Sequence, residues 1–182
     1  MEHQCTPRQL ARIFEHIESM WSDMGQSDPM YSVFSANRFR NANASEENIK
    51  EFYESGRLDT DALASELTGH ELPASVYTHC VELGCGLGRV TRYLSGFAEN
   101  VTGYNISEPH LQLASEHIAK MGVQNVALKK ISTHSSLIFK PFDLFYSRLV
   151  FQHNPPPIIY HILDTVLRSL TPGGMAVFQL PA

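Results

Sequence analysis

The sequence has few cysteines, no basic block and no long apolar run, and each shortage excludes a class of protein. Cys5, Cys80 and Cys85 form an odd set without a C-x-x-C pair, which argues against a disulfide framework and against a thiolate zinc site. The 14 lysines and arginines are outnumbered by 19 aspartates and glutamates, for a net charge of −5. We therefore expect neither nucleic acid nor acidic lipid as a partner.

No apolar run approaches the roughly 18 residues of a membrane span, and the first residues are polar rather than those of a signal peptide. These features predict a cytoplasmic protein that does not bind membranes. No cluster of His, Asp and Glu has metal-ligand spacing, so no metal is expected. The 182 residues, 43% of them hydrophobic, are enough for one core.

The first part of the chain has helical patterns only. Apolar residues recur at helical spacing over 6–24, and a Thr-Pro pair opens this helix. A short helix is predicted over 45–56, with a serine cap at its start and a glycine at its end, and another over 60–67. We interpret residues 1–73 as a helical cap on the substrate side of the molecule.

From residue 74 onward, short strand patterns alternate with helical ones. The expected strands lie within 76–83, 99–105, 123–131, 142–147 and 175–181, and the expected helices within 87–97, 108–122 and 156–170. This alternation predicts a doubly wound α/β fold, with a mostly parallel sheet and helices on both faces. Residues 74–182 would then form the ligand-binding core.

The sequence stops just after the fifth expected strand, which would be an exposed sheet edge. Natural domains usually cover such edges. We therefore expect a fragment of a longer chain, truncated after strand five, and dimerisation through this edge is conceivable.

Gly84, Gly86 and Gly88 follow the first strand in "VELGCGLGR". Glycines between a strand and a helix let the backbone approach a ligand closely, next to the free N–H groups of the helix. The G-x-G-x-G spacing differs from the dinucleotide fingerprint, and no Gly-Lys-Ser/Thr of a P-loop follows. The motif indicates another nucleotide derivative, or a tight turn without a ligand.

Four segments, "VELGCGLGR", "VTGYNIS", "FDLFYSRLVFQH" and "LRSLTPGGMAVFQLP", follow one another within residues 79–181. In kind and order they resemble the motifs of class I S-adenosylmethionine-dependent methyltransferases, here in a Rossmann-like fold. The resemblance implies S-adenosylmethionine as the cofactor and methyl transfer as the activity. The stretch 21–56 resembles bacterial methyltransferases of unassigned acceptor, some associated with sugar or glycan modification.

By this resemblance the backbone of Gly84, Cys85 and Gly86 passes under the methionine and ribose of the cofactor, and Glu82 faces its amino group. A carboxylate suits a ligand that carries a sulfonium and an ammonium group. Glu82 could instead cap a helix or bond to a loop.

Further cofactor contacts follow from the same resemblance, with two departures from it. Asn105 stands where the family has an acidic residue for the ribose hydroxyls, and Ser132 or Thr133 where it has one for the adenine amino group. Ile106 would cover the adenine ring, or belong to the core. Ser147, at the end of the fourth strand, is the last of the expected cofactor-binding residues.

Two candidates lie nearer the acceptor and the cofactor carboxylate. His153 could be a general base for a hydroxyl acceptor, or bond only to loop backbone. Arg38 could pair with the cofactor carboxylate, or be a solvated surface residue. We expect His110 and His117, one heptad apart on a helix, to face solvent.

The function predicted from the sequence is methyl transfer to a small-molecule or sugar-type acceptor, with a hydroxyl as the receiving group. A non-catalytic nucleotide-binding or scaffold module is the alternative, favoured by the two departures at Asn105 and Ser132. An NAD-dependent oxidoreductase is a third hypothesis, and the glycine spacing counts against it.

Overall fold

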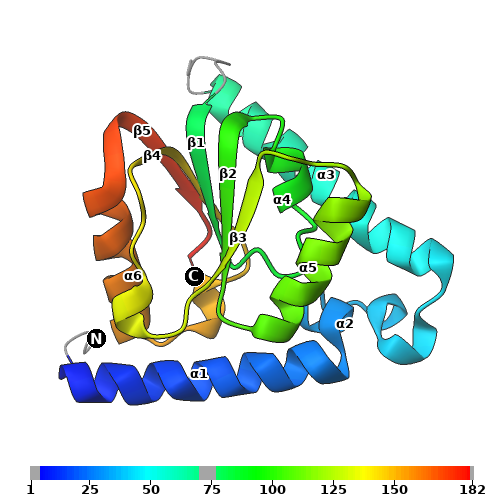
Figure 1. Cartoon of the computed structure of the whole chain (residues 1–182), viewed down its shortest axis with the longest axis horizontal. Helices are drawn as coiled ribbons and strands as arrows, with labels where there is room; N and C mark the ends of the chain where they lie inside the picture. Colours follow the sequence, from blue (N-terminus) through cyan, green and yellow to red (C-terminus); the bar gives the residue numbers. More distant parts are fainter. Residues whose placement is uncertain (1–4, 70–76, 181–182) are drawn as a thin grey trace.

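A five-stranded parallel sheet forms the centre of the protein, whose computed structural model describes residues 5–69 and 77–180 (Figure 1). The strands lie in the order β3-β2-β1-β4-β5, and every neighbouring pair is parallel. They are β1 (Tyr77–Leu83), β2 (Ala98–Asn105), β3 (Val126–Lys130), β4 (Phe142–Ser147) and β5 (Leu170–Phe178). The strand order changes direction between β1 and β4, where ligands of such sheets bind. The predicted fold class is confirmed.

Helices cover both faces of the sheet. The α-helices are α1 (Pro7–Ser27), α2 (Pro29–Val33), α3 (Glu46–Gly69), α4 (Thr91–Leu94), α5 (Glu108–Lys120) and α6 (Pro156–Ser169). Short 3-10 turns are η1 (Asn37–Phe39), η2 (Asn41–Asn43), η3 (His134–Ser136) and η4 (Phe151–His153). No helix in the described part of the chain combines the length and the apolar character needed to cross a membrane.

Alternate side chains of the strands serve two separate parts of the core. Val81, Leu83 and Phe145 join the cluster that includes side chains of α1 and α6. Cys80 and Leu144 point to the opposite face, where they pack with side chains of α3 and α4. The cap helices α1 and α3 are therefore built into the two halves of the core.

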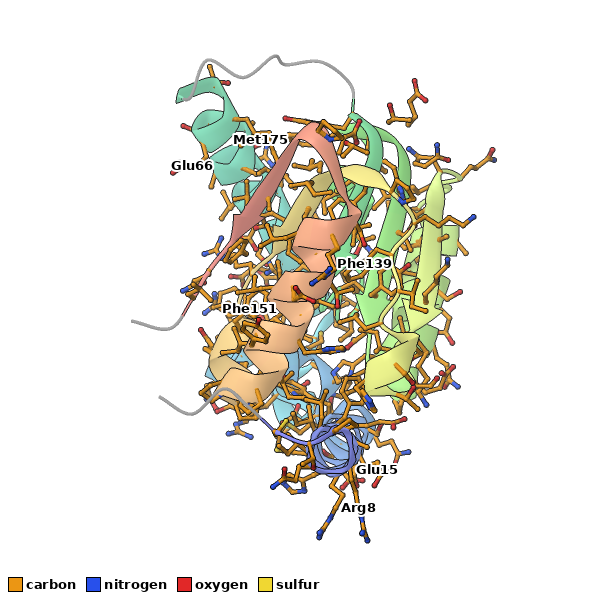
Figure 2. All side chains as sticks on the ribbon, turned by 90° about the vertical axis from the view of Figure 1, so that its left-hand side faces the viewer. Arg8, Glu15, Glu66, Phe139, Phe151 and Met175 are labelled. Atoms are coloured by element: carbon orange, nitrogen blue, oxygen red, sulfur yellow. The ribbon has the colours of Figure 1, made fainter. Side chains whose placement is uncertain are left out.

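Helix α1 crosses beneath the carboxyl ends of the strands and contacts α5 and α6 (Figure 1). It begins as predicted, with Thr6 as N-cap in a capping box and a proline at the first helical position. Phe14 and Ile17 are buried, whereas Arg8 and Glu15 point away from the sheet (Figure 2). This placement puts the apolar face of α1 against the strand ends.

Three sequence expectations need correction or lie outside the description. The two helices expected over 45–56 and 60–67 are the single helix α3, in which Gly56 is an interior, buried residue. Strand β5 begins at Leu170 rather than within the expected range 175–181, and its pairing with β4 has a register irregularity. The expected domain boundary at residue 73 falls outside the described residues.

Gly56 explains why α3 continues through a glycine. A Cβ atom there would lie 1.9 Å from the carbonyl oxygen of Arg89, the last residue of the glycine motif. The glycine is therefore required by the close approach of α3 to this loop, and it does not end the helix.

Candidate functional site

A cavity of about 120 Å³ lies between the carboxyl ends of β1, β2 and β4 and residues of α1 and α2. Most of the side chains around it are apolar, including Phe14, Trp21 and Leu137. The following six predicted cofactor residues line it: Glu82, Gly84, Cys85, Gly86, Asn105 and Ile106. The structure thus brings the ends of the first two expected strands to one site.

The glycine turn has a backbone that only glycine adopts readily. The φ angles are +78° at Gly84, +52° at Gly86 and +75° at Gly88. The amides of Gly84 and Cys85 both donate to the carbonyl of Tyr104, at 2.8 and 3.1 Å, which fixes the turn against β2. The positive φ angles and the two hydrogen bonds are those of a tight turn, one of the two explanations of the glycine motif given above.

Protein side chains also pack directly onto this turn. A Cβ atom on Gly84 would lie 2.2 Å from Cγ2 of Val150, and one on Gly86 would lie 2.9 Å from Cγ2 of Val33. Val33 belongs to α2 and Val150 to the loop after β4, and both line the cavity. The missing side chains therefore also make room for packing within the chain.

Glu82 ends β1 as a buried carboxyl group beside the cavity. Its Oε2 accepts a hydrogen bond from the hydroxyl of Thr91 at 2.5 Å. Burial raises the pKa of Glu82 to about 7, although the Thr91 hydrogen bond and the nearby Arg89 act in the opposite direction. The neutral form of Glu82 therefore persists to higher pH than in an exposed glutamate, and a cation in the cavity would favour its charged form.

An ion-pair network that the sequence did not reveal lies next to Glu82. Asp59 of α3, 6% exposed, pairs with Arg89 at 2.5 Å from Nη2 to Oδ2, and its other oxygen pairs with Nη1 of Arg148. Arg89 also donates to the hydroxyl of Ser55, at 3.1 Å. Both arginines line the cavity. Only Arg89 had a sequence signal, its position in the glycine motif, because the other partners are distant in the chain.

His110 corrects the expectation of a solvent-facing residue, since it is 1% exposed and lines the cavity. Its Nε2 lies 2.8 Å from the hydroxyl of Ser32 and its Nδ1 lies 2.7 Å from that of Ser107. Burial lowers the pKa of His110 to about 4, so the ring is neutral at pH 7. Gly25 of α1 makes room for the ring, since a Cβ there would approach it to 2.6 Å.

His117 is also less exposed than expected. It is half-buried, and its ring stacks on that of Tyr53, with 3.5 Å between centroids. Burial lowers the pKa of His117 to about 4, and the charges of Arg92 and Lys120 act in the same direction.

Four predicted site residues are not among those that line the cavity. Arg38 pairs with Glu51 at 2.8 Å and is exposed. Ser147 donates to the carbonyl of Leu83 at 3.0 Å, and so ties β4 to β1. Ser132 bonds through its backbone amide to a nearby serine hydroxyl.

His153, the fourth, packs edge-on against Trp21, with ring centroids 5.4 Å apart. Its neighbour Asn154 and Trp21 both line the cavity. Burial lowers the pKa of His153. Pro155 is the N-cap of α6, and Pro156 and Pro157 are its first two residues, so the helix begins within the expected range 156–170.

Asn105 has one polar atom engaged locally, because its Oδ1 accepts from the backbone amide of Ile106 at 2.8 Å. Its amide nitrogen remains a potential donor at the end of β2. Over residues 5–69 and 77–180, no group of three or more His, Cys, Asp or Glu side chains is placed to hold a metal ion.

The parallel sheet, the glycine turn after β1 and the cavity at the strand ends define an α/β protein of the nucleotide-binding type. Residues 80–174 match the family model described as a methyltransferase domain. The chain belongs to this family, and the predicted class I S-adenosylmethionine-dependent methyltransferase family is confirmed.

Curated relatives match over part of their length. A sterol 4-C-methyltransferase of Caenorhabditis elegans is 26% identical over 106 residues, which are 57% of this chain and 31% of that protein. A ubiquinone biosynthesis O-methyltransferase of Methylococcus capsulatus is 30% identical over 101 residues, 54% of this chain and 41% of that protein. The matched segments thus span about a third to two fifths of these relatives.

Solved structures share the fold at low sequence identity. Phosphoethanolamine N-methyltransferase 1 of Haemonchus contortus, solved with phosphoethanolamine and S-adenosylhomocysteine, has a TM-score of 0.71 at 17% identity, covering 97% of this chain and 33% of that chain. DhpI, solved with SAM and HEP, has a TM-score of 0.60 at 19% identity and covers 91% of this chain and 64% of that chain.

Proposed function

We propose that this chain binds S-adenosylmethionine at the cavity and transfers its methyl group to a small-molecule or sugar-type acceptor, with a hydroxyl as the receiving group. The observation that carries the proposal is the buried Glu82 beside the glycine turn. A carboxyl group with a pKa of about 7 is held there next to a cavity with mainly apolar walls. An ammonium group of the cofactor would stabilise its charged form.

The surrounding residues suit the rest of the cofactor. Ile106 offers an apolar surface for the adenine ring, and the amide nitrogen of Asn105 can donate to a ribose hydroxyl. Methyl transfer from a sulfonium is an in-line displacement, which gains most from alignment and from exclusion of water. Phe14 and Trp21 of α1 supply apolar cover over the strand ends.

For a hydroxyl acceptor, His153 stays the proposed general base. Its lowered pKa favours the neutral imidazole, the form that accepts a proton. Two relatives are named a sterol 4-C-methyltransferase and a ubiquinone biosynthesis O-methyltransferase. These names support a small-molecule acceptor, and they differ in the atom that receives the methyl group. A cytoplasmic location without nucleic-acid or membrane partners stays a prediction.

The test is isothermal titration of S-adenosylmethionine and S-adenosylhomocysteine into the wild type, Glu82→Gln and the matched control Glu99→Gln, an exposed carboxylate on β2. We expect binding by the wild type and the control, and weakening of about tenfold or more in Glu82→Gln. Absence of binding at millimolar ligand would contradict the proposal. Release of S-adenosylhomocysteine with hydroxyl-bearing acceptors then separates a methyltransferase from the scaffold alternative.

A further inference from the structure

Positive side chains predominate around the cavity. The charged residues that line it are Glu82, Arg89 and Arg148, and His110 is neutral at pH 7. Asp59 lies just behind and is shared by both arginines. Two guanidinium groups thus lie beside two carboxyl groups, and burial raises the pKa of one of them, Glu82.

Arg89 is committed to the structure of the protein. Its side chain is 8% exposed; one terminal nitrogen forms an ion pair with Asp59, and the other donates a hydrogen bond to the hydroxyl of Ser55. The guanidinium also lies over the ring of Phe34, 5.6 Å from its centroid. Arg89 therefore holds α3 and the cap against the glycine turn.

Arg148 is much more exposed to solvent than Arg89. Its side chain is 44% exposed although the residue lines the cavity, so it lies where the cavity meets solvent. A guanidinium carries five N–H donors. The bonds to Asp59 and to the hydroxyl of Tyr146 use only some of them.

The backbone beside Arg148 is held in an unusual conformation. Leu149 has a φ of 59°, a left-handed value that residues other than glycine rarely adopt. Arg148, Leu149 and Val150 all line the cavity. Asp59 fixes the arginine from behind, so its remaining donors are oriented at little further cost in entropy.

We propose that Arg148 binds an anionic group of the methyl acceptor, a phosphate, phosphonate or carboxylate, at the mouth of the cavity. This inference rests on the proposed function. S-adenosylmethionine carries two cationic groups and one carboxylate, so its binding adds positive charge to a site that already has two arginines. An acceptor with a negative group balances that charge, and a planar guanidinium matches such a group with paired hydrogen bonds.

The competing role for Arg148 is to pair with the carboxylate of the cofactor itself. The two roles differ in what they require of the ligand. S-adenosylhomocysteine has an amino-acid carboxylate, whereas 5′-methylthioadenosine keeps the nucleoside and lacks that group. A loss of affinity confined to S-adenosylhomocysteine would identify the cofactor carboxylate as the partner.

The experiment compares the wild type with Arg148→Met, Arg148→Lys and the matched control Arg57→Met, an exposed arginine on α3. Inorganic phosphate and acetate are titrated into free and S-adenosylhomocysteine-saturated protein at constant ionic strength. S-adenosylhomocysteine and 5′-methylthioadenosine are titrated in parallel. Cofactor-product binding by each variant also reports that it is folded.

We expect saturable binding of phosphate or acetate to the wild type and to Arg57→Met, weakened about 10- to 100-fold in Arg148→Met. Arg148→Lys should be intermediate, because it keeps the charge and loses the paired geometry. Tighter binding of phosphate would indicate a phosphate or phosphonate on the acceptor, and tighter binding of acetate would indicate a carboxylate. Affinity for S-adenosylhomocysteine should stay within about twofold in all variants.

Three results overturn the inference: no saturable anion binding to the wild type, unchanged binding in Arg148→Met, or a loss in that variant of affinity for S-adenosylhomocysteine alone. Failure of the wild type to bind S-adenosylhomocysteine, with anion binding intact and dependent on Arg148, would instead contradict the proposed function. The two failures are thus distinguishable.

Discussion

At the residue scale, the glycines after β1 meet two demands at once. Gly84 and Gly86 have positive φ angles, and each also lies where a Cβ would collide with a valine of another segment. Loss of ligand binding on substitution at Gly86 would therefore not by itself locate the cofactor. A substitution series must separate backbone strain from packing.

Gly86→Ala should destabilise the protein by about 2–4 kcal/mol, from left-handed strain together with the collision with Val33. Gly122→Ala is the matched control, since Gly122 has φ +68° and nothing within 4 Å of its added Cβ. Gly122→Ala should lower the free energy of unfolding by only about 1 kcal/mol. Urea unfolding measures both, and Val33→Ala should recover part of the loss in Gly86→Ala. Equal losses at both glycines would show that packing on Gly86 is unimportant.

Asp59 is the residue on which the buried ion pairs converge. Asp59→Asn leaves Arg89 without its counter-charge, and removing one partner of a buried pair costs about 3 kcal/mol or more. Asp61→Asn, an exposed change on the same helix, should alter the free energy of unfolding by less than about 0.5 kcal/mol. Denaturant unfolding of the two variants compares them directly. Similar stabilities would mean that the network does not stabilise the fold.

The site residues that could be predicted from the sequence are those in short local motifs. Glu82 and the glycines lie in one such motif, and Asn105 follows the next strand, so strand order alone brings them together. Arg38 was a candidate only by its position in the cap, and the structure pairs it with Glu51. The Asp59–Arg148 contact joins segments far apart in sequence, so no local sequence pattern predicts it.

At the scale of elements, α3 shows how tertiary contact overrides a local signal. Gly56 resembles a helix end, yet the helix runs on because the glycine allows the Arg89 carbonyl to come close. Similarly, β5 begins before its Pro-Gly-Gly segment because pairing with β4 extends to Leu170. Helix α1 was easier to predict, since its cap, its proline and its apolar spacing all agree.

Two glycines of α3 provide a matched test of this explanation. Gly56→Ala places a methyl group against the backbone of Arg89 and should cost about 2–4 kcal/mol. Gly69→Ala, at the end of the same helix with nothing within 4 Å, should be neutral or stabilising by up to about 1 kcal/mol. Thermal unfolding distinguishes the opposite signs. A neutral Gly56→Ala would show that α3 can move away from the glycine turn without loss.

At the scale of the whole molecule, two buried groups near the cavity respond oppositely to pH. The pKa of Glu82 is raised from 4.5 to about 7, so its burial reduces stability as pH rises through that interval. The pKa of His110 is lowered from 6.5 to about 4, so its burial reduces stability as pH falls through that interval. Over the shared range the two effects largely cancel.

Removing either ionisable group should therefore leave the pH dependence of stability that comes from the other. As pH rises from about 4.5 to 7, the free energy of unfolding of Glu82→Gln should increase by about 3 kcal/mol relative to that of its parent. As pH falls from about 6.5 to 4, that of His110→Gln should increase by a similar amount relative to the parent. The His117→Gln background is the parent for both, because His117 has a pKa shifted in the same direction as His110. Urea unfolding across this pH range measures the slopes, which do not depend on any constant loss from broken hydrogen bonds. Parallel pH profiles for the parent and both variants would contradict the buried-charge account of the site, whereas opposite slopes would show that one cavity balances an acid against a base.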